Sequence, residues 1–155
     1  SEILYKRGVS YERLKLWKKS ENDLIRSLSL VPEEPYVLNY LAYSWLERNY
    51  KIDVAMQMLE KAYEQEPDDA FIIDSIGWAH YLTGNYIKAE KLLKKAIQIM
   101  PNDPIVNDHY GDILWHLDRK IEAQYYWKSV LSFNDSEDEM KDKAYIKILK
   151  GLKKI

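Results

Sequence analysis

The stretch AFIIDSIGWAHYLTGNYIKAEKLLKKAIQIMPND, residues 70–103, decides the fold of this chain. Apolar side chains in its second half recur three to five residues apart, which is the spacing of one face of an α-helix. Pro101 follows that half, because proline cannot continue a helix. Two antiparallel helices of about 13 residues with two short turns use up about 34 residues. The apolar face consists of Leu92, Leu93, Ala96, Ile97 and Met100.

Small residues recur along the whole chain at intervals of about 34 residues. Ala55, Ala89 and Ala123 are evenly spaced at this interval. Where two helices cross, a large side chain would hold the backbones apart, whereas Gly or Ala lets them close. The second repeat has one extra residue, which we place in the turn around residues 48–53. The other recurring positions are Gly8, Ala42, Gly77 and Gly111, and prolines recur at Pro32, Pro67 and Pro101.

These positions resemble the tetratricopeptide repeat, a helix–turn–helix unit of about 34 residues. The resemblance covers residues 1 to about 136, and His80 stands where the family usually has Tyr. It implies an all-α fold, a right-handed α-α superhelix, or solenoid, of about four helix pairs. The third unit matches best, with Ile76, Gly77, Gly84, Tyr86, Ala89, Leu93, Ala96 and Pro101.

Residues 135–155 do not repeat, and they predict a C-terminal capping helix. Asp135-Ser136 suits a helix N-cap, and the end of a stacked array needs a helix with a polar outer face. A basic amphipathic helix that binds a membrane or an acidic partner is the alternative. In either case, we expect the apolar stripe of this C-terminal helix to consist of Met140, Ala144, Tyr145, Ile148, Leu149 and Leu152. The prediction is one domain over residues 1–155, with repeats at 1–34, 35–69, 70–103 and 104–136 and the capping helix at 137–155.

Composition excludes several classes of function. The chain has 155 residues, a formal net charge of −2 and no cysteine. The charge balance argues against a nucleic-acid binder, and the missing cysteines exclude disulfides and thiolate metal sites. No run approaches the roughly 18 apolar residues of a membrane span, so we expect no membrane insertion by this segment. Since the first residue is Ser and no capping helix precedes it, we expect a longer parent protein.

The resemblance implies that the first helices of the repeats line a concave groove that binds a peptide. Trp and Tyr are common anchors of binding hot spots, and Asp favours Lys or Arg in a ligand. We expect Asp74 and Asp108 to face solvent, whereas packing between repeats is the alternative for Trp78 and Trp115. The predicted partner-binding residues are Asn39, Tyr43, Asp74, Trp78, Tyr81, Asp108, Asp112 and Trp115.

The sequence carries little sign of catalysis. It contains no phosphate-binding glycine loop, no G-x-S-x-G elbow and no H-E-x-x-H helix. His109, Asp112 and His116 share a helix face and are the one alternative for a metal site. Asp74 and Asp108 could form an acid/base pair, but no nucleophile accompanies them. We therefore expect no catalytic residues, no metal and no cofactor.

The predicted function is a non-catalytic interaction module or scaffold that binds a peptide segment of another protein. We expect the segment to carry basic or apolar residues, no nucleic acid to bind, and the isolated chain to be a monomer with weak self-association at high concentration. The alternative is a structural end-block that caps and rigidifies a longer solenoid, with binding elsewhere.

A narrower resemblance rests on residues 74–81 and 107–115. These segments are similar to the C-terminal repeats of long bacterial, especially alphaproteobacterial, tetratricopeptide repeat proteins. Many of those carry an export signal or a lipid anchor and act as adaptors at the cell envelope. The resemblance therefore implies the cell envelope or periplasm, with the cytoplasm as the alternative.

Overall fold

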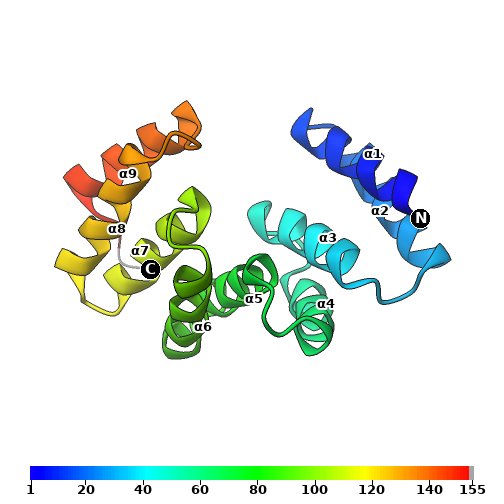
Figure 1. Ribbon diagram of the computed structural model, residues 1–155, viewed down its shortest axis with the longest axis horizontal. Coiled ribbons are helices and arrows are strands. Elements are labelled where there is room, and N and C mark those ends of the chain that lie inside the picture. The colour runs from blue at the N-terminus through cyan, green and yellow to red at the C-terminus, as the bar shows by residue number, and fades with distance from the viewer. Residues whose placement is uncertain (154–155) are drawn as a thin grey trace. The chain divides into compact units, whose positions relative to one another are not determined.

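A computed structural model describes residues 1–153 of the chain. Within them the only regular elements are nine α-helices (Figure 1). The prediction of an all-α repeat fold is therefore confirmed. The helices are α1 (Glu2–Arg13), α2 (Trp17–Leu30), α3 (Pro35–Glu47), α4 (Ile52–Gln65), α5 (Ala70–Leu82), α6 (Tyr86–Ile99), α7 (Pro104–His116), α8 (Lys120–Ser132) and α9 (Asp138–Lys150).

Local chemistry sets where the helices begin. Helix α3 starts with Pro35 after Glu34, whose carboxylate accepts a hydrogen bond of 2.7 Å from the backbone N–H of Val37. Asp103 caps α7 in the same way, with a bond of 3.0 Å from the backbone N–H of Val106. A carboxylate at this position satisfies an N–H group that the helix leaves unpaired, and proline in the first turn has a suitable φ.

The short turns within the helix pairs need residues with positive φ. Lys15, Gly84 and Asp118 supply one such residue in each of three turns, whereas the turn between α3 and α4 contains two, Asn49 and Lys51. That turn is also longer, with four residues between the helices instead of three. The extra residue of the second repeat therefore lies where the sequence placed it.

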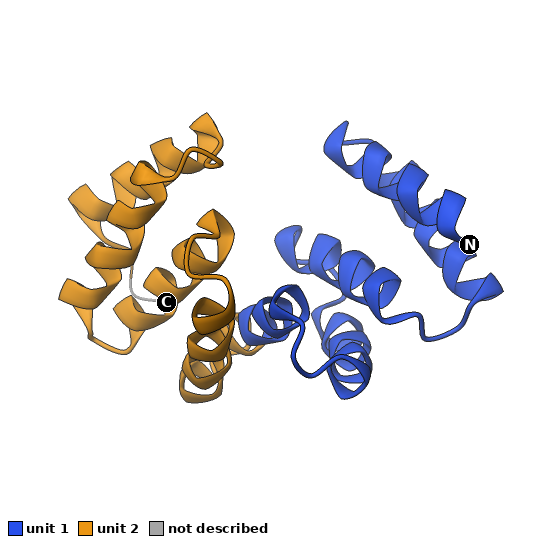
Figure 2. Cartoon of the chain, in the orientation of Figure 1, with its two compact units in different colours: residues 1–79 blue, residues 80–155 orange. Residues whose placement is uncertain are grey.

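Packing divides the chain into two compact units, unit 1 with residues 1–79 and unit 2 with residues 80–155 (Figure 2). In unit 1, α1 packs on α2 and α3 packs on α4. Leu38, Ala62 and Ile72 form a buried cluster there. In unit 2, α7 packs against α6 and α8, and α9 packs against α8. The assignment of four repeats and a capping helix to one domain stays a prediction, and residues 154–155 of that helix lie outside the described residues.

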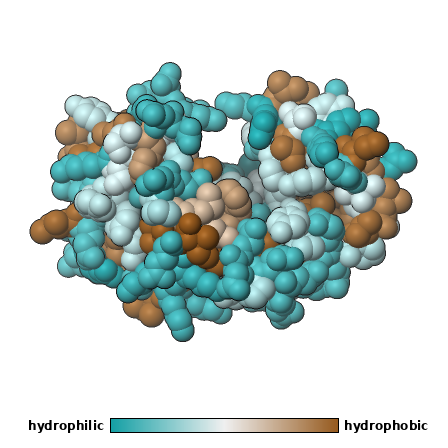
Figure 3. All heavy atoms as spheres, viewed as in Figure 1, coloured by the Kyte–Doolittle hydropathy of each residue, from teal (hydrophilic) through white to brown (hydrophobic). Residues whose placement is uncertain are grey.

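Several large apolar side chains remain at the surface in separate places (Figure 3). Ile87 on α6 and Ile121 on α8 are 74% and 88% exposed. Both lie on helices whose opposite face is buried, and Tyr125, one turn after Ile121, is exposed as well. Exposed apolar side chains are ordinary on a folded protein. None of the helices in residues 1–153 has the length and apolarity needed to cross a bilayer.

The small recurring residues lie where helices touch. A Cβ atom on Gly8 would approach the Leu24 side chain of α2 to 2.9 Å. One on Gly111 would lie 2.5 Å from Nε1 of Trp127 on α8. Ala89 and Ala123 are fully buried. The regular spacing of the small residues therefore reflects close packing of helices.

The two glycines should respond differently to the same substitution. Gly111→Ala should lower the free energy of unfolding by roughly 1–3 kcal/mol, because the buried indole cannot move without losing its contacts. Gly8→Ala should cost less, since the Leu24 side chain is flexible and alanine favours the helix by about 0.5–1 kcal/mol. Urea denaturation followed by circular dichroism measures both, and a Gly111→Ala variant as stable as Gly8→Ala would contradict the packing described here.

Candidate functional site

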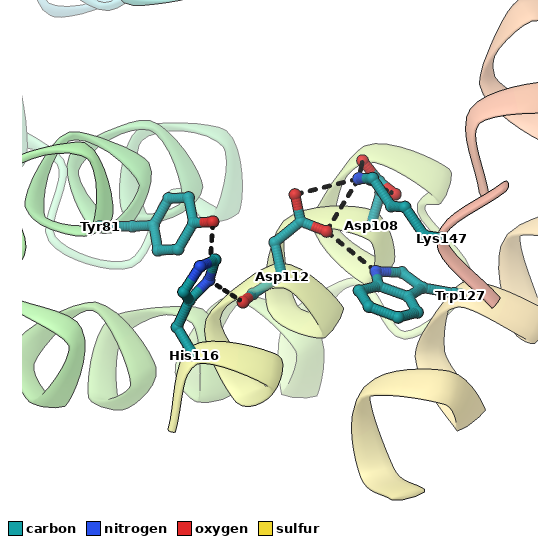
Figure 4. Close-up of polar contacts among 6 residues, drawn as sticks. All are labelled: Tyr81, Asp108, Asp112, His116, Trp127 and Lys147. Atoms are coloured by element: carbon teal, nitrogen blue, oxygen red, sulfur yellow. Dashed lines mark hydrogen bonds and ion pairs between the residues drawn. The ribbon is translucent and has the colours of Figure 1, made fainter. Parts of the chain in front are cut away.

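In unit 2 a lysine ammonium lies between two carboxylates (Figure 4). Nζ of Lys147 on α9 is 2.8 and 2.9 Å from the two carboxylate oxygens of Asp108. It is 2.8 and 3.0 Å from those of Asp112. The two aspartates are one turn apart on α7, so that they share one face of the helix. The ion cluster of Asp108, Asp112 and Lys147 joins α9 to α7.

Asp112 is the most deeply buried member of this cluster. Its side chain is 8% exposed, against 18% for Asp108 and 16% for Lys147. Nε1 of Trp127 donates a further hydrogen bond of 2.9 Å to its Oδ1 (Figure 4). A buried carboxylate needs such partners, because an unpaired charge away from water is costly.

Burial dominates the electrostatics of Asp112. It raises the pKa of this carboxyl to about 6, and the negative charge of Asp108 adds to the rise, although Lys147 opposes both. For Lys147, burial works to lower the pKa, but Asp112 and Asp108 together raise it above its ordinary value. Lys147 therefore stays protonated, and Asp112 is the group of this pair that titrates near neutral pH.

A second polar chain in unit 2 connects Tyr81 with the backbone of α7. The Tyr81 hydroxyl is 3.0 Å from Nδ1 of His116, and the same nitrogen is 3.1 Å from the backbone oxygen of Asp112 (Figure 4). The rings of Tyr86 and His116 stack with their centres 5.4 Å apart. Burial raises the pKa of Tyr81. The Tyr81 hydroxyl, predicted to contact a partner, is thus bound within the protein.

Trp115 holds the end of α9. Its Nε1 donates a hydrogen bond of 3.1 Å to the backbone oxygen of Leu152, and its ring lies against that of Trp127. Gly151 has a φ of 67°, and a Cβ on it would run into the Trp115 ring. Only glycine lets the chain pass so close to the indole in this conformation. Much of the Trp115 ring is thus engaged in packing within the protein, which was the alternative to partner binding for this residue.

The predicted residues of unit 1 lie on α3 and α5. Asn39 and Tyr43 are one turn apart on α3, and both are half-buried. Asp74 and Trp78 are one turn apart on α5, where Trp78 is half-buried and Asp74 is only 4% exposed. The structure does not test whether these residues bind a partner.

The expectation that Asp74 and Asp108 face solvent is wrong. Asp74 lies in a stretch of α5 that is buried throughout, from Ile72 to Gly77. Asp108 is mostly covered, because Lys147 binds its carboxylate. Asp112 is likewise buried. A charged residue in the first helix of a repeat therefore need not reach solvent, since a neighbouring helix can supply its partner.

The predicted apolar stripe of the last helix also needs correction. Met140, Ala144 and Ile148 do face inward, but Tyr145 and Leu149 are exposed. Lys147 takes an inward position because two carboxylates lie opposite it. Sequence reasoning missed Lys147 and Trp127 as members of the site, and it considered His116 only as a metal ligand. The available signal was the spacing of Lys147, which follows Ala144 of the predicted apolar stripe by three residues and so lies close to the same helix face.

The alternative of a metal site has no support in the part of the chain that the structure describes. Among residues 1–153, no group of three or more His, Asp or Glu side chains could hold a metal ion. Asp112 binds Lys147, and Nδ1 of His116 lies against a hydroxyl and a backbone carbonyl oxygen.

Comparison with known proteins gives the family. Residues 70–103 match the model of the tetratricopeptide repeat. A TPR repeat-containing protein of Pseudomonas aeruginosa is 33% identical over 110 residues, which are 71% of this chain. The chain is a tetratricopeptide repeat protein. It spans 18% of the length of that relative.

Solved structures agree on the fold. MamA from Desulfovibrio magneticus RS-1 is similar with a TM-score of 0.69 and 20% identity, covering 88% of this chain and 77% of that one. A thermophilic TPR protein of Thermus thermophilus is similar with a TM-score of 0.65 and 17% identity, covering 96% and 98%. Identities this low show a shared fold and nothing more specific.

The buried carboxyl of Asp112 gives a pH dependence that can be measured. The folded pKa of about 6 lies above the ordinary 3.8, so the folded state binds this proton more tightly than the unfolded state. This contribution is full below pH 3.8 and is lost as the pH rises through 6. Relative to Asp112→Asn, the wild type should therefore gain on the order of 1–3 kcal/mol between pH 7 and pH 4.

Urea unfolding of both proteins across this pH range measures the difference. Asp118→Asn is the matched control, because Asp118 has a side chain that is 90% exposed. Parallel pH profiles for the wild type and Asp112→Asn would contradict the raised pKa.

Proposed function

We propose that this chain is a non-catalytic interaction module that binds a peptide segment of a partner protein on the faces of its first helices. Tetratricopeptide repeat proteins serve generally as protein-interaction scaffolds, and the family match supports that broad role. The proposal adds a ligand class, a segment that presents lysine or arginine beside apolar side chains. Its place in the cell stays a prediction from the narrower resemblance.

The contact between Lys147 and the two aspartates of α7 carries the proposal. It is an internal example of a lysine held on a first helix by carboxylates one turn apart. The short distances and the low exposure of all three groups make such a contact selective for an ammonium or guanidinium group. A basic side chain of a partner is the external equivalent.

The remaining candidates for the partner site lie in unit 1. On α3, Asn39 precedes Tyr43 by one turn, and on α5, Asp74 precedes Trp78 by the same interval. Both rings are partly accessible. Oδ1 of Asn39 is buried and accepts no hydrogen bond from any described residue. Reorienting this amide toward a donor on a partner would satisfy it.

A structural end-block is the second candidate, and α9 favours it. Lys147 fastens the middle of this helix to α7, and Trp115 fastens its end through Leu152. Both contacts are largely covered from solvent, as expected of a permanent part of the fold. On this view α7 and α9 rigidify the end of the array, and binding takes place elsewhere.

Panning a random peptide display library on the chain tests the first candidate. The enriched peptides should contain Lys or Arg next to apolar residues. Tyr43→Ala and Trp78→Ala should each weaken binding of an enriched peptide at least about tenfold, because buried aromatic anchors dominate such interfaces. Ile87→Ala, on the exposed side of α6, is the control and should bind as the wild type does.

Circular dichroism melts of the same variants separate lost binding from lost folding. Reversing the charge of Asp74 and Asp108 is unsuitable, because both carboxylates are largely buried. A library that yields no specific peptide, or peptides that bind Tyr43→Ala and Trp78→Ala as tightly as the wild type, would overturn the peptide site and favour the end-block.

A further inference from the structure

In the repeat register, helix α9 corresponds to the first helix of a fifth repeat. Its bounds, Asp138–Lys150, lie one repeat length after those of α7, Pro104–His116. In α7, the face with Gly111, Asp112 and Trp115 contacts Trp127 of its own second helix, α8. The matching face of α9 therefore consists of the residues one repeat length later, which are Tyr145, Ile146 and Leu149.

This face is apolar and accessible. Tyr145, Ile146 and Leu149 are 56%, 53% and 63% exposed. They lie at positions i, i+1 and i+4, and so they form one continuous ridge along the helix. No helix among residues 1–153 covers them. Clustered exposed side chains of this size mark a surface for association.

The residue of α9 at the position where the two helices of a repeat cross argues against a helix pair as close as those within the repeats. The first helices carry Gly8, Ala42, Gly77 and Gly111 at this position, whereas α9 carries Tyr145. A phenol ring there holds a neighbouring helix away, so the surface suits a wider pairing of two helices with large side chains between them.

Charged side chains of both signs lie along α9. Asp138, Glu139, Lys141, Asp142 and Lys143 lie in its first half, where Lys143 pairs with Glu139 at 3.0 Å, and Lys147 and Lys150 lie in its last turn. Lys147 is engaged inside the protein, whereas Asp138, Asp142 and Lys150 are exposed. Two such helices that run antiparallel, with Ile146 at the centre, set Asp142 of each opposite Lys150 of the other. A parallel pair would instead oppose like charges.

We propose that the exposed face of α9 pairs with α9 of a second copy of this chain, in an antiparallel, two-fold symmetric contact. The apolar ridge forms its centre, and Asp142 of each copy lies opposite Lys150 of the other across the axis. A helix of about 13 residues is about 20 Å long, so the pair buries less than the roughly 1,200 Å² of a standard interface. The contact is therefore weak, and the chain is monomeric at micromolar concentrations.

Sedimentation of the 155-residue chain between roughly 10 μM and 1 mM tests the proposal, since weak interfaces associate in about this range. The average mass of the wild type should rise toward that of a dimer. Ile146→Glu should raise the dissociation constant at least about tenfold. Ile121→Glu changes a still more exposed isoleucine, on α8; it is the control and should associate as the wild type does.

Charge reversal tests the antiparallel arrangement. Asp142→Lys and Lys150→Glu should each weaken self-association, because each opposes like charges. A mixture of the two variants should form heterodimers, since both contacts across the axis then join opposite charges. A wild type that stays monomeric at the highest concentration, an unaffected Ile146→Glu, or a mixture that does not associate would each overturn the proposal. Loss of association on Ile3→Glu alone would assign it to α1 instead.

Discussion

The close crossing of helices at small residues is the constraint on which the rest of unit 2 depends. Because Gly111 has no side chain, the indole of Trp127 lies directly against the backbone of α7. That approach brings Nε1 of Trp127 to Asp112. Asp112 can then remain buried, since it has a donor on one side and Lys147 on the other. The orientation of α9 thus depends on the absence of a Cβ atom at Gly111.

The ion cluster also decides which way α9 faces. Burying the ammonium group of Lys147 has a desolvation cost in free energy, and the two carboxylates one turn apart on α7 offset that cost. A rotation of α9 that buried Tyr145 and Leu149 would leave Asp108 and Asp112 without their cation. The helix therefore turns a lysine inward and leaves an apolar ridge at the surface.

The two units use equivalent positions of their first helices differently. On α7, Asp108 and Asp112 are occupied by a side chain of the same chain. On α3 and α5, the equivalent positions offer partly accessible rings, Tyr43 and Trp78. The carboxylates of α7 are thus bound within the fold, whereas α3 and α5 keep partly accessible aromatic rings.

The sequence by itself determined the repeat and the position of the extra residue near Lys51, because these depend on local properties. The expected N-cap of the last helix, Asp135-Ser136, was wrong, since the N-cap is Glu137 and Ser136 donates a hydrogen bond to the backbone oxygen of Val130. Proline ends helices, carboxylates cap them, and small residues mark their crossings wherever they occur. Only the tertiary structure decided that Asp112 is buried and that Lys147 faces inward. These outcomes depend on groups that are 35 and 39 residues apart in the chain and meet only after folding. A local sequence pattern does not predict such a contact, because the free-energy cost of burying each charge depends on the partner that another helix supplies.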